Sequence, residues 1–227
     1  MARERRTLYF ELLVTVGLLV LPNLLRAIEL FLDPSQQGAR PEDASWHFAS
    51  LILFELLLLG LLAHILRLNG ETLADLTVPF AGRDVPRGIG LAILAYVAYY
   101  AAGFALMGLT GGFQEPSRRS MDVFNAPFSV WYLLGAIVNP FAEEFFVRGF
   151  LQTRLRQAGH SSLNVVLFSV AVQASYHLYQ GALPCLSLAF CFLIFALYYQ
   201  AKRRLWPAVI AHLIMDVLAM LFYMKRG

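Results

Sequence analysis

Charged side chains are scarce in this sequence. Only 15% of its 227 residues are Asp, Glu, Lys or Arg, whereas an ordinary globular domain has about 25%. The net charge is +3, and the basic residues gather at the ends of apolar runs. This pattern indicates membrane topology rather than phosphate binding, so we expect no nucleic-acid partner.

Cysteine is scarce as well. The two cysteines, Cys185 and Cys191, lie in one apolar run. Six residues apart on a helix they are separated by about 9 Å, which is too far for a disulfide. We interpret both as free thiols that pack in the interior.

What the chain has in abundance is apolar sequence. Hydrophobic residues make up 59% of it, and its mean hydropathy is +0.61. Seven apolar segments have about the length that a membrane-spanning helix needs: Leu8–Leu32, Trp46–Leu66, Ile89–Leu109, Phe128–Leu151, Leu163–Tyr179, Leu183–Tyr199 and Leu205–Tyr223. We predict an all-α polytopic transmembrane bundle of about seven spans in a lipid bilayer, a single membrane domain over 1–227. An eighth, interfacial helix within 70–86 is the alternative.

The charges between the spans predict an orientation. Segments 67–87, 152–162 and 200–204 are basic, and they fall on one side together with the arginine-rich N-terminus. By the positive-inside rule this side is cytoplasmic. Arg118-Arg119 and Lys225-Arg226 oppose the rule, but the short loops weigh more.

Two adjacent carboxylates follow the fourth apolar run. Burying a carboxylate in hydrocarbon costs several kcal/mol, so Glu143 and Glu144 need a structural partner or a chemical role. Glu144 and Arg148 are four residues apart and share a helix face, whereas Glu143 is rotated by about 100°. The arginine can therefore hold Glu144 and leave Glu143 free. Pro140 removes a helical hydrogen bond nearby and predicts a bend that makes room beside Glu143.

Further polar groups fall at matching depths. His160 lies in an obvious turn. Glu143 lies 17 residues before it, and His177 lies 17 residues after it. On straight helices both would sit about 25 Å from the turn and face each other. His212 and Asp216, one helical turn apart, follow a basic loop and reach the same region.

This set suits hydrolysis, because a poorly hydrated carboxylate can act as general base on water and a histidine can share the proton. A cluster that only locks helices together, a metal site and a proton path remain alternatives. We interpret Glu11, Glu55 and His64, which stand alone in apolar helices, as structural.

Three motifs carry a family resemblance. Glu143-Glu144-Phe145-Phe146-Val147-Arg148 resembles the EExxxR motif of the CPBP (Abi) intramembrane proteases, which include the type II CAAX prenyl endopeptidases. Tyr176-His177-Leu178-Tyr179-Gln180-Gly181 resembles the region of that family's FxxxH motif, and His212-Leu213-Ile214-Met215-Asp216 its HxxxN or HxxxD motif. The resemblance covers a catalytic core over 125–220.

The resemblance implies an intramembrane endopeptidase that cleaves near the cytoplasmic face, with a peptide or a prenylated protein as substrate. Glu143 and His177 would activate water, and His212 and Asp216 would stabilise the oxyanion. Glu144 and Arg148 would shape the site. Two departures stand out: Gln173 replaces the motif's phenylalanine, and Asp216, if ionised, would repel an oxyanion.

Three alternatives remain beside this reading. The family has been described both as glutamate-dependent and as metal-dependent, and Glu143, His177, His212 and Asp216 could bind zinc. No HExxH motif is present, so we favour a mechanism without a cofactor. A non-catalytic membrane immunity or interaction protein of the same fold is a second alternative, and a transporter, for which we find no internal repeat, is a third.

Overall fold

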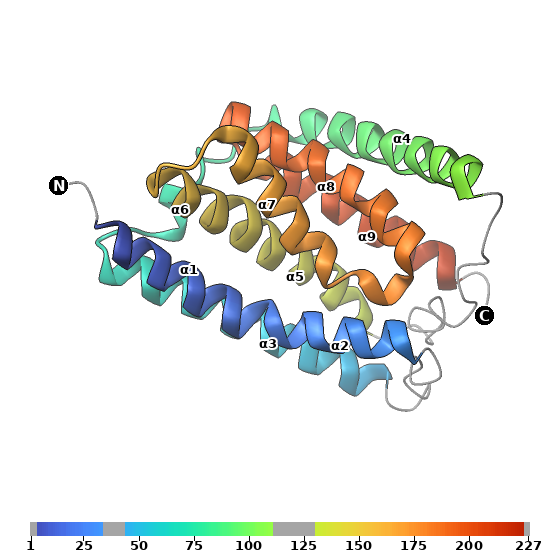
Figure 1. Cartoon of the computed structure of the whole chain (residues 1–227), viewed down its shortest axis with the longest axis horizontal. Helices are drawn as coiled ribbons and strands as arrows, with labels where there is room; N and C mark the ends of the chain where they lie inside the picture. Colours follow the sequence, from blue (N-terminus) through green and yellow to red (C-terminus); the bar gives the residue numbers. More distant parts are fainter. Residues whose placement is uncertain (1–3, 34–43, 111–129, 225–227) are drawn as a thin grey trace.

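The computed structural model describes residues 4–33, 44–110 and 130–224, and these fold into helices joined by turns (Figure 1). Arg118-Arg119, Lys225-Arg226 and most of the acidic loop 33–45 lie outside the described residues. The elements are α1 (Arg5–Leu19), α2 (Leu21–Leu32), α3 (Ala44–Leu68), η2 (Leu73–Leu76), α4 (Asp84–Thr110), α5 (Val130–Glu144), η4 (Phe145–Leu151), α6 (Gln152–Gln157), α7 (Ser162–Ser175), η5 (Leu178–Gln180), α8 (Ala182–Lys202) and α9 (Trp206–Met224).

The predicted multi-pass membrane bundle is confirmed. Five helical stretches are long and apolar enough to cross a membrane, namely Arg5–Leu32, Ser45–Leu68, Asp84–Thr110, Val130–Gln157 and Ala182–Lys202. Ser162–Ser175 and Trp206–Phe222 are shorter apolar helices. Each of the seven predicted segments therefore overlaps one apolar helix of the structure, either long or short. The chain is therefore an integral membrane protein.

Three boundaries differ from the prediction. The first span is divided near Val20 into α1 and α2, and Pro22 lies in the first turn of α2, where a proline needs no helical donor. The fifth span ends at Ser175 instead of Tyr179. Segment 70–86 contains a single 3-10 turn, η2, where an eighth helix was the alternative.

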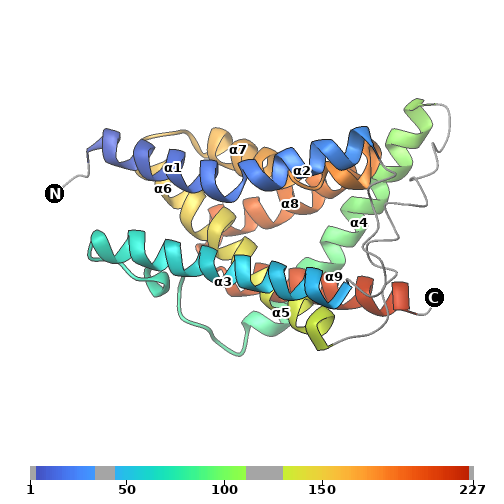
Figure 2. The ribbon, with the colours of Figure 1, turned by 90° about the horizontal axis from the view of Figure 1, so that it is seen from below.

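The helices form two layers, which Figure 2 shows from below. Helices α1, α2, α7 and α8 lie in one layer, and α3, α5 and α9 in the other. Helix α4 packs against both α8 and α9. The stretch η4 crosses between the layers and touches α3, α7 and α8, so the residues on either side of it reach both layers.

The stretch η4 is a π-helix, which the sequence analysis did not predict. Helix α5 continues through Pro140 to Glu144, and the wider turns run from Phe145 to Leu151. π-Turns inside α-helices are rare and are frequent at functional sites. Here the wide turns begin immediately after the paired carboxylates.

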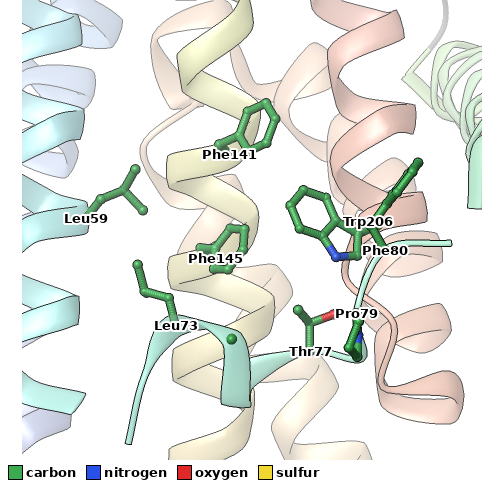
Figure 3. A pocket seen from close by; sticks show the side chains of 9 residues that line it. Leu59, Leu73, Thr77, Pro79, Phe80, Phe141, Phe145 and Trp206 are labelled. Atoms are coloured by element: carbon green, nitrogen blue, oxygen red, sulfur yellow. The ribbon is translucent and has the colours of Figure 1, made fainter. Parts of the chain in front are cut away.

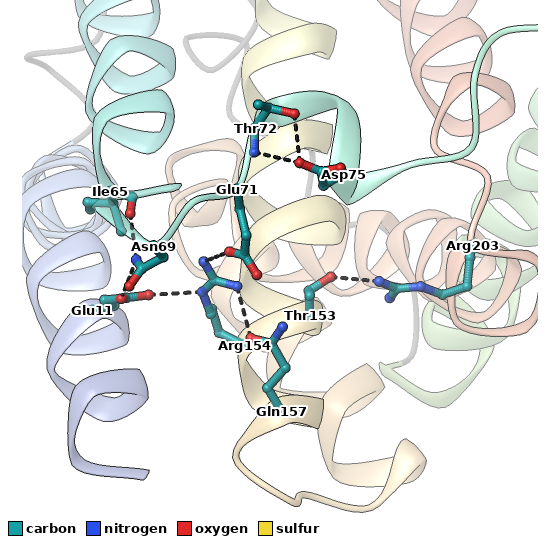
Figure 4. A network of polar contacts seen from close by, with 10 residues as sticks. All are labelled: Glu11, Ile65, Asn69, Glu71, Thr72, Asp75, Thr153, Arg154, Gln157 and Arg203. Atoms are coloured by element: carbon teal, nitrogen blue, oxygen red, sulfur yellow. Dashed lines mark hydrogen bonds and ion pairs between the residues drawn. The ribbon is translucent and has the colours of Figure 1, made fainter. Parts of the chain in front are cut away.

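Two of the basic segments meet close to α1: Arg154 contacts Glu11 of α1, and Arg203, after α8, contacts Thr153 next to Arg154 (Figure 4). Arg154 of α6 is buried and binds Glu11 of α1 at 2.9 Å and Glu71, beyond α3, at 2.5 Å. Arg204, before α9, binds both carboxylate oxygens of Asp84 at 2.8 and 2.6 Å. Glu11 therefore has the structural role predicted for it, and these two basic segments lie together as the topology prediction requires.

Helices α4 and α9 approach each other closely at Gly88. A methyl group added there would lie 2.5 Å from Cγ2 and 2.6 Å from Cβ of Ile210. Gly90, on the same helix, has nothing within 4 Å of the equivalent position.

We predict that Gly88→Ala destabilises the protein by about 1–3 kcal/mol, because the added methyl must push α4 away from α9. Gly90→Ala is the matched control and should be neutral or slightly stabilising, since alanine favours helix. Thermal unfolding in detergent measures both. Equal melting temperatures for the two variants would contradict the close approach of α4 and α9.

Candidate active site

Glu143 and Glu144 lie in different environments. Glu144 is fully buried, with its Oε2 3.4 Å from Nε of Arg148 and its Oε1 3.0 Å from Nδ1 of His212. The predicted pairing of Glu144 with Arg148 is therefore present, and His212 joins it from α9. Glu143 is only half-buried at the end of α5. One carboxylate is held by two partners, while the other is open to a ligand.

Gln173, which replaces the motif's phenylalanine, links the first two motifs. Its side chain is fully buried. The side-chain oxygen accepts a hydrogen bond from Arg148, and the side-chain nitrogen donates one of 2.7 Å to Glu143. A phenylalanine could make neither bond. This departure from the family pattern is thus a polar bridge between the buried guanidinium and the free carboxylate.

The backbone at Gln173 fixes His177. Helix α7 ends at Ser175, so the carbonyl of Gln173 loses the amide donor that a continuing helix would supply. Nδ1 of His177 lies 2.8 Å from this carbonyl oxygen. Because a carbonyl only accepts, Nδ1 carries the hydrogen, which leaves Nε2 of a neutral imidazole with a free lone pair.

The straight-helix geometry predicted for His177 is wrong. The residue follows α7 in a turn, and no hydrogen bond joins it to Glu143 among the described residues. Both residues are instead bound to Gln173, one through its amide and one through its carbonyl. The end of α7 at Ser175 could not be predicted from residue spacing, because Tyr176 and Tyr179 continue the apolar run beyond it.

The third motif adds His212 and Asp216 from α9. Nε2 of His212 lies 3.6 Å from Oδ1 of Asp216, an ion-pair distance rather than a hydrogen bond. The amide of Asn139 donates a 3.1 Å hydrogen bond to Oδ2 of Asp216. Asn139 was missed as a site residue, although it lies one helical turn before Glu143 on α5.

The same four side chains, Glu143, His177, His212 and Asp216, are the candidates for a zinc site. Among the described residues, no three His, Cys, Asp or Glu side chains are grouped as ligands of one ion would be. Nδ1 of His212 binds Glu144, and Nδ1 of His177 binds a carbonyl, which leaves Nε2 as the nitrogen of each ring that could bind an ion. The zinc alternative of Glu143, His177, His212 and Asp216 therefore stays a hypothesis beside the metal-free one.

An apolar cavity of about 340 Å³ lies beside α5 (Figure 3). Phe141 and Phe145 of this helix region line it, with Leu59 of α3 and Trp206 of α9. The two phenylalanines are one turn apart, and Glu143 projects about 200° away from either. The cavity therefore opens on the side of α5 opposite Glu143, toward α3.

Fold and site together define a multi-pass membrane protein with an internal cluster of carboxylates and histidines. Residues 125–218 match the family model described as "Type II CAAX prenyl endopeptidase Rce1-like", which confirms the resemblance drawn from the three motifs over this range. This family is a protease family, and all four predicted site residues lie within the match. No match was found among curated proteins or among solved structures.

The bridge at Gln173 can be tested against a second buried glutamine. Gln173→Leu removes partners from both Arg148 and Glu143, so we predict a destabilisation of about 3 kcal/mol or more. Gln152 is equally buried, but within the described part of the chain its side-chain nitrogen donates only to Ser169, at 3.0 Å. Gln152→Leu should therefore cost clearly less. Chemical denaturation in detergent measures the two free energies, and a larger loss for Gln152→Leu would contradict the bridge.

Proposed function

We propose that the chain is an intramembrane endopeptidase in which Glu143 activates a water molecule for attack on a peptide bond. The observation that carries this proposal is that the two adjacent carboxylates differ in their bound partners and in their exposure. Glu144 is committed to Arg148 and His212. Glu143, in contrast, accepts a hydrogen bond from Gln173, has Tyr176 as a second hydrogen-bond partner, has no ion pair with an arginine among the described residues, and keeps some exposure. A positioned, partly desolvated carboxylate suits general base catalysis.

In this mechanism His177 works beside Glu143. The hydrogen bond from Nδ1 to the Gln173 carbonyl orients the ring, and the free Nε2 lone pair can take up or share the proton of the attacking water. Since Gln173 holds both groups, the base and the histidine keep one fixed relation to each other.

His212 supplies the positive end of the oxyanion site in this proposal. Its ring donates from Nδ1 to Glu144, and Asp216 lies 3.6 Å from Nε2. A histidine donor near the developing negative charge would stabilise the tetrahedral intermediate. Asp216 acts through its charge on His212 rather than as a donor to the oxyanion, and Asn139 holds the carboxylate in place.

The proposal includes the side of the membrane on which cleavage takes place and two candidate classes of substrate. The basic residues Arg154 and Arg203, which lie close to α1, support a cytoplasmic N-terminus by the positive-inside rule. Cleavage then takes place near the cytoplasmic face. The candidate substrates are a prenylated CAAX peptide and an unprenylated membrane protein or peptide.

We predict opposite outcomes for the two neighbouring glutamates. Glu143→Gln should abolish cleavage while leaving the melting temperature near that of wild type, because Glu143 is not a partner of Arg148. Glu144→Gln should lower the stability by about 3–5 kcal/mol, because it unbalances a buried charge pair. The assay uses purified protein on a panel of prenylated and unprenylated peptides, with thermal unfolding beside it.

Retained cleavage by both Glu143→Gln and His177→Ala would overturn the mechanism. If wild type and both variants were equally inert while a cellular phenotype survived the substitutions, the non-catalytic membrane protein would be the correct reading.

The metal-free mechanism has its own test. We predict that dialysis of the purified protein against a strong chelator leaves the cleavage rate unchanged, because the proposed base and histidine need no ion to activate water. Complete loss of activity, restored by zinc and by no other divalent ion, would contradict this mechanism. Chelation of a known zinc protease under the same detergent conditions is the control.

A further inference from the structure

Glu55 of α3 is a buried acid that the mechanism above does not use. Its residue is only 3% exposed, and its Oε2 has no hydrogen-bond partner among the described residues. It lies outside the range matched by the family model, and the sequence analysis interpreted it as structural. A buried carboxyl group in a membrane helix, with one oxygen left without a hydrogen bond, points to a function.

Glu55 lies on the face of α3 that packs against the site. Phe48, two turns earlier on the same face, stacks on Tyr132 of α5 with ring centroids 4.4 Å apart. Phe48 and Tyr132 share an apolar cluster with Met220 of α9. Accordingly, the ionisable groups that interact electrostatically with Glu55 are Glu143, Asp216 and His212.

Burial makes an ionised Glu55 costly, because no arginine or lysine is bound to it among the described residues. Two of its three ionisable neighbours are carboxyl groups, and the third, His212, already binds Glu144. Ionising Glu55 would add a further buried negative charge with no guanidinium or ammonium group bound to it. Such a charge costs several kcal/mol, whereas a buried carboxylic acid costs far less.

The same face of α3 leads to the apolar cavity. Leu59, one turn beyond Glu55, lines that cavity together with Phe141 and Trp206 (Figure 3). An apolar portion of a substrate lying in the cavity would therefore lie about one turn of α3 from the acid.

We propose that Glu55 is a further catalytic residue of this site, the general acid that protonates the leaving nitrogen. This rests on the proposed protease function. Glu143 takes a proton from water, and the resulting hydroxide adds to the carbonyl carbon. The carbon–nitrogen bond then breaks as the Glu55 proton passes to the nitrogen. The proton held by Glu143 returns to Glu55, so one water is consumed and both carboxyl groups end as they began.

The test compares two leaving groups in one peptide sequence. An amine needs a proton to leave, whereas an activated phenol ester does not. Glu55→Gln should lower kcat for the peptide about 100-fold and leave kcat for the ester unchanged. His64→Gln, an exposed position on the same helix, is the matched control and should change neither. Equal losses on both substrates, or no loss on the peptide, would overturn the proposal.

A second measurement does not depend on proteolysis. The infrared spectrum of the purified wild-type protein should contain a protonated carboxyl band that Glu55→Gln removes and His64→Gln retains. An unchanged band in Glu55→Gln would overturn the proposal. If wild type cleaves neither substrate, the proposed protease function fails, and the infrared spectra still decide whether Glu55 holds a proton.

Discussion

The buried guanidinium of Arg148 is the charge on which the arrangement of this site depends. It has no exposed surface, so its positive charge must be balanced inside the bundle. Glu144 balances the charge from one turn earlier on the same helix. Its two terminal nitrogens donate hydrogen bonds to the side chains of Ser169 and Gln173 in α7 and to the carbonyl of Phe192 in α8. One side chain thereby joins α5, α7 and α8.

This interaction also separates the roles of the adjacent carboxylates. Because Glu144 is occupied by Arg148 and His212, it connects the first and third motifs and cannot move freely. Gln173, which also binds Arg148, positions two further residues: its side-chain amide donates a hydrogen bond to Glu143, and its backbone carbonyl accepts one from His177. The groups proposed for water activation are thus held by a residue that neither activates water nor carries charge.

Much of the fold could be predicted from composition, because apolar runs of about 20 residues have few alternatives to membrane helices. The Glu144–Arg148 pair could be predicted because both residues lie on one helix. The end of α7, the π-turns of η4 and the bridge at Gln173 could not be predicted. They depend on where backbone hydrogen bonds stop and on which helices pack together. The interaction of Glu55 with Glu143, on which its proposed role rests, could not be predicted for the same reason, since it depends on the packing of α3 on α5.

Transfer of oxygen from water tests the central claim, that Glu143 is a base and not a nucleophile. A single turnover would be run in water enriched in the heavy oxygen isotope, followed by mass analysis of the peptide product and of the protein. The account predicts one heavy oxygen in the new carboxyl group of the product after this first turnover, and none in Glu143. Heavy oxygen in Glu143, with an unlabelled first product, would indicate a covalent intermediate and contradict the account.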